Sequence, residues 1–255
     1  MTATLDARGV ARVLTVDRSA SRNALDSRTI DALVAHARAV GKDRHARAIV
    51  LAASPPTFVA GGDLHEFGAL RGESGGRTVA RKGKALVAAL RAAKLPLVAA
   101  IDGPAFGGGC ELAAACDLRF AHKDSSFHWV QNKLAVTTGW GATARLVALV
   151  GPSIAAQWLL GAESVTASAA LEARFVNQLC REGTALEAAL TWTERLASID
   201  PAVTRAQLAL VRAEIDQATA RAAASELRAF SASWALPAHE AAVARFTAGR
   251  ARRGR

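Results

Sequence analysis

Three consecutive glycines at residues 107–109 separate an apolar run from a stretch of small residues that favours a helix. The apolar run, residues 96–101, has the composition of a buried strand. Glycine adopts positive φ and lets other atoms come close to the main chain, at a cost in conformational entropy. We therefore expect a tight strand-to-helix turn, with unpaired backbone N–H groups at the start of the helix.

A second glycine turn lies earlier in the chain. Residues 60–63 (Ala-Gly-Gly-Asp) follow the apolar Phe58 and Val59, and Asp63 suits the capping position of a helix. A helix N-terminus also carries a partial positive charge. If the fold brings the two turns together, two N–H groups can converge on one oxygen and form an oxyanion hole. Losing one donor of such a hole typically costs about 3 kcal/mol.

Glu111 lies about one helical turn beyond the three glycines, where its carboxylate could face the α and β carbons of the same carbonyl compound. The alternative is structural: the glycines permit close packing of helix on strand, and Glu111 favours a first helical turn. A phosphate-binding loop is not indicated, because the sequence has neither GxGxxG spacing with a distal acid nor a GK[ST] ending here.

The remaining pattern predicts an α/β core followed by helices. Strands are expected at residues 11–16, 48–52, 96–101, 118–121 and 127–130, and helices at residues 26–41, 77–93, 142–150, 153–160 and in the segment from 182 to 245. Residues 72–76 (Gly-Glu-Ser-Gly-Gly) predict a mobile loop. No apolar run is expected to reach membrane-spanning length, and the first residues do not form a basic and then apolar leader.

The chain of 255 residues carries a formal net charge of +10. This positive charge has two interpretations. It can reflect solvated arginines on the surface, four of them in residues 250–255, or it can serve to attract a nucleic acid or a phosphate-rich small molecule. Cys110, Cys116 and Cys180 are an odd number without metal-site spacing. This pattern predicts that the cysteines are buried free thiols of a protein in the reducing cytoplasm, and that they do not form a metal site.

Around the two glycine turns the sequence resembles the crotonase superfamily, also called the enoyl-CoA hydratase/isomerase family. Residues 58–64 (FVAGGDL) and 101–112 (IDGPAFGGGCEL) carry the resemblance, and residues 22–25, 116–121, 139–146 and 166–170 support it. It implies an α/β crotonase-like spiral of ββα units. It also implies a helical C-terminal segment that builds a homotrimer or a dimer of trimers. We accordingly expect a core for acyl-CoA binding and catalysis at residues 1–195 and a helical oligomerisation region at residues 196–255.

The resemblance also implies roles for single residues, with a coenzyme A thioester as the substrate and no cofactor. Ala60 and Gly108 would supply two N–H donors to the thioester oxygen, and Glu111 would be the acid and base. The residues expected to line the adenine and pantetheine path are Arg22, Ala24, Ala60, Gly62, Asp63 and Leu64. Arg250 and Arg252 are further candidates for phosphate contacts.

The sequence departs from the family pattern at one position. Hydratases of this family use two glutamates; Glu111 matches the first, and Gln131 stands at the second. Glutamine can hold a water molecule but cannot exchange a proton with it. General acid–base catalysis by a second carboxylate is typically worth about 10² to 10⁴ in rate. Hydration and double-bond isomerisation through one carboxylate stay open. So does decarboxylation of an alkylmalonyl-CoA, because residues 129–141 and 233–239 resemble the ethylmalonyl-CoA decarboxylase branch.

Five other side chains lie in or next to these motifs. His65 and His128 could act as acid or base near neutral pH, but structural roles are expected. Trp129 and Trp140 are expected in the wall of the acyl pocket or in the core, and Cys110 in packing.

The alternative from another class of function is a non-catalytic or RNA-binding member of the family. Neither a nucleic acid nor a membrane is the expected partner, because the positive residues are dispersed without an aromatic stacking motif.

Overall fold

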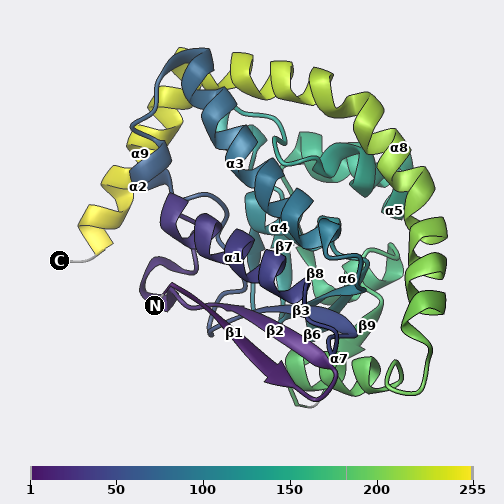
Figure 1. Ribbon diagram of the computed structural model, residues 1–255. Coiled ribbons are helices and arrows are strands. Elements are labelled where there is room, and N and C mark those ends of the chain that lie inside the picture. The colour runs from purple at the N-terminus through teal and green to yellow at the C-terminus, as the bar shows by residue number, and fades with distance from the viewer. Residues whose placement is uncertain (1, 182, 254–255) are drawn as a thin grey trace.

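The computed structural model describes residues 2–181 and 183–253, with side chains up to residue 248 (Figure 1). In these residues the strands form two sheets. The larger sheet has the order β1 (Ala3–Arg8), β2 (Ala11–Val16), β3 (Ala48–Ala53), β4 (Leu97–Ile101), β6 (Leu118–His122), β9 (Gln178–Cys180). The smaller sheet has the order β5 (Ala105–Phe106), β7 (Ser126–His128), β8 (Ser164–Thr166).

From β4 to β7 the chain alternates between the two sheets. From β2 to β9 the neighbours in the larger sheet pair in parallel, whereas β1 pairs antiparallel with β2. β5 follows β4 within a few residues and pairs in parallel with β7, which follows β6 in the same way. Each turn of this spiral therefore returns the chain to the junction between the sheets, where the two glycine turns lie.

Helices surround the sheets (Figure 1). They are α1 (Ser27–Val40), α2 (Leu64–Phe67), α3 (Gly72–Ala92), α4 (Gly108–Ala115), α5 (Ala142–Gly161), α6 (Ala167–Glu172), α7 (Ala185–Glu194), α8 (Pro201–Trp234) and α9 (Pro237–Arg253). The short 3-10 helices η1 (Ser19–Ser21) and η2 (Asn132–Leu134) lie in loops. Helix α8 curves along the outside of the molecule against α3 and α5, and α9 returns beside α2 (Figure 1).

Successive residues of a strand point to opposite faces of its sheet, and the larger sheet buries both faces. Leu14, Ile49 and Leu51 belong to the main core. Val13 and Val50 belong to a smaller cluster that includes Ala185 of α7. The main core also contains Phe230 and Trp234 of α8, so the last helices share it. The division of the chain at residue 195 stays a prediction.

The strongly patterned elements agree with the sequence. Helix α1 begins after Asp26, whose carboxylate accepts the Thr29 N–H at 2.7 Å. Strands β3 and β4 are buried along almost their whole length, as continuous apolar runs predict. The strand expected at residues 127–130 ends earlier, at His128. β1, β8 and β9 were not predicted, because they are short or carry many polar residues.

The expected mobile loop at residues 72–76 is wrong, because these residues form the first turns of α3. Two of the three glycines in this segment are instead needed for close packing. A Cβ atom on Gly75 would lie 2.9 Å from the carbonyl carbon of Leu70, and one on Gly76 would lie 2.7 Å from the Cβ of Trp234. Helix α3 therefore approaches α8 more closely than any larger residue at position 76 would allow.

The expectation about apolar runs also needs correction. By length and mean hydropathy, α5 is a helix that could cross a membrane, because its two expected halves join. The join is a kink: Gly151 has φ 79° and ψ 161°, and Pro152 follows it. The buried Arg145 in this helix lies 3.6 Å from Asp216 of α8.

We predict that Gly76→Ala destabilises the protein, although alanine favours a helix. Its Cβ would press on the Cβ of Trp234 and on the main chain of Ser231. Overpacking of this kind typically costs about 1 to 3 kcal/mol. Chemical denaturation measures the free energy of unfolding. Gly41→Ala is the matched control, because its Cβ would meet no atom closer than 3.4 Å. Equal stability of the two variants would contradict the close approach of α3 and α8.

Candidate active site

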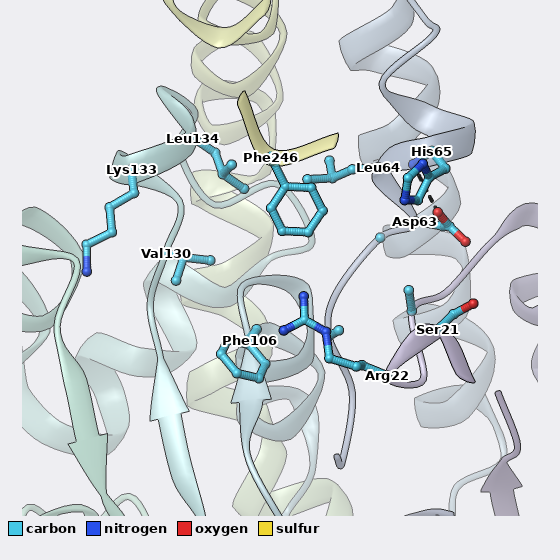
Figure 2. Close-up of a pocket in the computed structure, with 13 residues that line it drawn as sticks. Ser21, Arg22, Asp63, Leu64, His65, Phe106, Val130, Lys133, Leu134 and Phe246 are labelled. Atoms are coloured by element: carbon cyan, nitrogen blue, oxygen red, sulfur yellow. Dashed lines mark hydrogen bonds between the residues drawn. The ribbon is translucent and has the colours of Figure 1, made fainter. Parts of the chain in front are cut away.

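Two adjoining cavities lie at the junction of the sheets. The larger has a volume of about 290 Å³. It is lined by all six residues expected along the coenzyme A path (Arg22, Ala24, Ala60, Gly62, Asp63, Leu64) and by Ser21, His65, Phe106, Val130, Lys133, Leu134 and Phe246 (Figure 2). The smaller, of about 80 Å³, is lined by Ala60, Gly108, Glu111 and Gln131. Ala60 and Gly62 line both cavities, so the two lie side by side.

The two glycine turns contact each other through their main chains. Val59 pairs with Ala105, and the Phe106 N–H donates to the Val59 carbonyl at 2.9 Å. A Cβ atom on Gly61 would lie 3.0 Å from the Gly108 nitrogen, and one on Gly109 would lie 2.0 Å from the Val59 oxygen. Side chains cannot fit between the turns, which is the structural reason for the glycines there.

Both expected N–H donors remain available at this junction. The Gly108 N–H is the first of α4, one of the donors that a helix leaves without an internal partner. Gly107, with φ 49°, reverses the chain just before it. In the part of the chain that the structure describes, neither the Ala60 N–H nor the Gly108 N–H donates to a protein acceptor. The smaller cavity is bordered by both residues.

The Glu111 carboxylate is buried, 3% exposed, and is held by backbone donors. Its Oε2 accepts the Trp140 N–H at 2.7 Å and the Gly139 N–H at 3.1 Å. The side-chain Nε2 of Gln131 donates to Glu111 Oε1 at 3.3 Å. These donors fix the carboxyl group at the wall of the smaller cavity.

Burial and, to a smaller extent, the negative charge of Glu226 raise the pKa of Glu111 from 4.5 to about 8. This net value already includes the hydrogen bonds from Trp140, Gln131 and Gly139, which lower the pKa. Glu226 comes from α8; its carboxylate accepts the Thr138 hydroxyl at 2.9 Å and lies 3.4 Å from Lys84. At neutral pH the Glu111 carboxyl group is therefore mostly protonated, and it becomes a base near pH 8.

Gln131 lies beside Glu111 with its own polar group incompletely paired. Its side chain is 6% exposed and lines the smaller cavity. The Oε1 atom of Gln131 is buried and has no hydrogen-bond partner among the described residues. A buried acceptor of this kind is costly unless a ligand or water pairs with it. It can accept a hydrogen bond from a hydroxyl group or water in the cavity.

The larger cavity is lined by both polar and apolar side chains (Figure 2). The Arg22 guanidinium lies 5.5 Å from the centre of the Phe106 ring, and Phe246 of α9 points into the cavity opposite (Figure 2). Asp63 caps α2 by accepting the His65 N–H at 3.0 Å, and it pairs with Arg18 at 3.0 Å. The cap fixes the turn that carries Ala60 and Gly62.

Several residues flanking the motifs lie in the core or in the smaller sheet. His128 stacks on Phe106 and hydrogen-bonds to Ser126 and Ser164. Trp129 is fully buried beside Trp158 and Phe175. Cys110 is buried, and burial raises the pKa of its thiol. The side chains of Arg250 and Arg252 lie outside the described residues.

Two features of the site were missed in the sequence. The clamp on Glu111 uses main-chain N–H groups of residues 139 and 140, and such donors have no signature in residue type. Glu226 lies 115 positions from Glu111 in a helix of ordinary composition, so nothing local marks it. The glycine-rich segment 139–146 was recognised, but its contact with the carboxylate was not.

Comparison with known proteins agrees with this arrangement. A family model described as enoyl-CoA hydratase/isomerase matches residues 6–250. The chain is 32% identical to 2,3-dehydroadipyl-CoA hydratase of Escherichia coli, covering 86% of this chain and 85% of that protein. It is also 32% identical to a probable enoyl-CoA hydratase of Rhizobium meliloti, covering 96% and 95%. A solved enoyl-CoA hydratase/isomerase from Xanthobacter autotrophicus, 28% identical, superimposes with a TM-score of 0.89 over 98% of this chain and 95% of that one. The expected fold is confirmed.

We predict that Glu111→Gln changes how stability depends on pH. The pKa of Glu111 is raised on folding, so its contribution is present below about pH 4.5 and is lost as pH rises through about 8. Relative to the variant, the wild type should lose roughly 3 to 5 kcal/mol of unfolding free energy between about pH 5 and about pH 9. Urea denaturation across this range measures the difference. Parallel curves for the two proteins would show that the carboxyl group is not desolvated.

Proposed function

The chain belongs to the enoyl-CoA hydratase/isomerase family, and on this premise we propose that it hydrates or isomerises an enoyl-CoA through a thioester enolate. One observation carries the proposal. The buried Glu111 carboxyl group and the residues Ala60 and Gly108, whose N–H groups are without protein acceptors among the described residues, line the same small cavity. A thioester carbonyl bound there would have donors at its oxygen and an acid or base near its carbon chain.

In this proposal the larger cavity holds the pantetheine and adenine parts of coenzyme A. Arg22 and Lys133 line that cavity, and the phosphate groups of coenzyme A are negative. The acyl group passes Ala60 and Gly62, which line both cavities, into the smaller one. The thioester is a substrate, and the proposed steps call for no separate cofactor.

Hydration would proceed with Glu111 as the only carboxylate. Ionised Glu111 removes a proton from water as the water oxygen bonds to Cβ of the 2-enoyl group. The double-bond electrons move onto the thioester oxygen, where the Ala60 and Gly108 N–H groups stabilise the enolate. Glu111 then gives the proton to Cα, which restores the carbonyl. Gln131 Oε1 would accept a hydrogen bond from the water and orient it.

Isomerisation would use the same groups without water. Glu111 removes a proton from Cα of a 3-enoyl thioester, which gives a dienolate with its charge on the thioester oxygen. It then returns the proton to Cγ, and the double bond moves to the 2 position. Both reactions need Glu111 to begin as a base.

Two observations favour decarboxylation of an alkylmalonyl-CoA as a second candidate. Gln131 replaces a carboxylate that would repel the carboxylate of such a substrate, and Glu111 is mostly protonated at neutral pH. Breaking the bond to CO₂ leaves its electron pair on the thioester enolate, so no base is needed. Glu111 would then donate its proton to Cα.

Other expectations from the sequence stay predictions. They are the homotrimer or dimer of trimers, the cytoplasmic location and the absence of nucleic-acid and membrane partners. A salt-sensitive complex with RNA that coenzyme A does not displace would instead favour the RNA-binding alternative.

We predict opposite pH profiles for the two candidate reactions. Hydration or isomerisation needs the ionised form of Glu111, so kcat/KM should rise with pH and level off above about 8. Decarboxylation needs the protonated form, so kcat/KM should fall above about 8. Assays with crotonyl-CoA, a 3-enoyl-CoA and an alkylmalonyl-CoA at several pH values measure this.

Glu111→Gln should lower kcat/KM for the accepted thioester by about 10² to 10⁴ and remove this pH dependence. Glu214→Gln is the control, because Glu214 is exposed on α8. The catalytic assignment fails if the wild type turns over none of the three thioesters, or if Glu111→Gln keeps full activity.

We predict that Gln131→Glu raises hydration of crotonyl-CoA by at least about tenfold, since a second acid–base group is typically worth about 10² to 10⁴. The same change should lower decarboxylation, because the new carboxylate repels that of the substrate. Asn132→Asp is the control, because it adds the same charge at the exposed neighbouring residue. A rise in both variants, or in neither, would show that Gln131 does not face the reacting carbons.

A further inference from the structure

The far wall of the smaller cavity is built from large buried side chains. Phe67, Val136, Trp140, Phe230 and Trp234 line the cavity, and each is at most 6% exposed. The volume of about 80 Å³ is roughly half that of a cavity that holds benzene in another protein, about 150 Å³. The space beyond the two proposed N–H donors is therefore small.

Trp140 is a part of this wall that contacts both Glu111 and Gly108. Its main-chain N–H donates to Glu111 at 2.7 Å, which fixes the backbone. The six-membered edge of its indole lies against Gly108, where an added Cβ would come within 2.7 Å of Cη2 and Cζ3. The indole thus borders the proposed donor to the thioester oxygen.

The opposite edge of the indole is seated on a second glycine. A Cβ on Gly83 of α3 would lie 2.2 Å from Cδ1, Nε1 and Cε2 of Trp140. The ring therefore fills the slot between α3 and the start of α4, with main chain on both sides. Interiors packed in this way do not yield to a larger ligand without strain, so the ring is a fixed wall.

We propose that the Trp140 indole, seated between Gly83 and Gly108, restricts this protein to compact acyl groups of about four to six carbons. The inference rests on the proposed function and adds to it the class of acyl chain. A longer acyl chain would have to displace the indole. One methylene group more or less in an apolar pocket typically changes kcat/KM by about 10 to 200-fold.

The test compares the straight-chain 2-enoyl-CoA thioesters with four and eight carbons, or the matching alkylmalonyl thioesters if decarboxylation is the activity found. For the wild type, kcat/KM with eight carbons should be at least about a hundredfold below that with four. In Trp140→Ala the ratio of kcat/KM with eight carbons to kcat/KM with four carbons should rise at least about tenfold. The main-chain N–H to Glu111 is retained in the variant, and the readout is the ratio between the two chain lengths rather than the activity on either one.

The matched control is Trp158→Ala, which removes another buried indole in the cluster with Trp129 and Phe175, away from both cavities. Its ratio should stay within about twofold of the wild-type value, because lost stability alone affects both substrates equally. If Trp140→Ala does not fold, Trp140→Leu should shift the ratio in the same direction by a smaller factor.

Dissociation constants for butanoyl-CoA and octanoyl-CoA separate this inference from the proposed reaction. A shift of their ratio in Trp140→Ala, with no turnover of any thioester by the wild type, would support the wall and reject the reaction. An unchanged ratio, or equal affinity of the wild type for both chains, would overturn the role of Trp140 even if the enzyme is active. Failure to bind either thioester would overturn both.

Discussion

The site depends on direct contact between two stretches of main chain. The turn at residues 60–62 lies against the turn at residues 107–109, where the bridge between Val59 and Ala105 joins the smaller sheet to the segment after β3. Side chains at Gly61 or Gly109 would push the turns apart by colliding with backbone atoms. Ala60 and Gly108 line the same cavity because nothing larger than hydrogen stands between the turns.

Main-chain groups also explain how the Glu111 carboxyl group can be buried here. Glu111 lies in the first turn of α4, where the helix dipole favours negative charge. Backbone donors at Gly139 and Trp140 compensate part of the desolvation, yet burial and Glu226 still raise its pKa to about 8. Ionised Glu111 is therefore destabilised relative to water, which makes it a stronger base than an ordinary glutamate once it loses its proton.

The aromatic side chains around the smaller cavity also pack directly against glycines. Phe230 sits on Gly139, Phe67 on Gly62, Trp234 on Gly76, and Trp140 between Gly83 and Gly108. Helix α8, which supplies two of these rings and Glu226, is held by Arg212. The Arg212 guanidinium donates to both oxygens of Asp117, at 2.8 and 2.5 Å, just beyond the end of α4. The helix that carries Glu111 and the helix that closes the cavity are thus joined by a largely buried ion pair, in which loss of one partner typically costs about 3 to 5 kcal/mol.

The sequence by itself determined the α/β fold, the buried strands β3 and β4, the cap at Asp26 and the glycine turns, because these follow from local periodicity and backbone freedom. Through the resemblance it also named Ala60, Gly108, Glu111 and Gln131, which line the smaller cavity, and six of the residues that line the larger one. It misjudged residues 72–76, since glycine in a close helix contact has the same local pattern as glycine in a loop. Only the tertiary structure brought Glu226 and the N–H groups of residues 139 and 140 to Glu111, and placed Trp140 between two glycines. Those contacts join segments far apart in the chain through main-chain atoms and long-range charge, which residue types along the sequence do not encode.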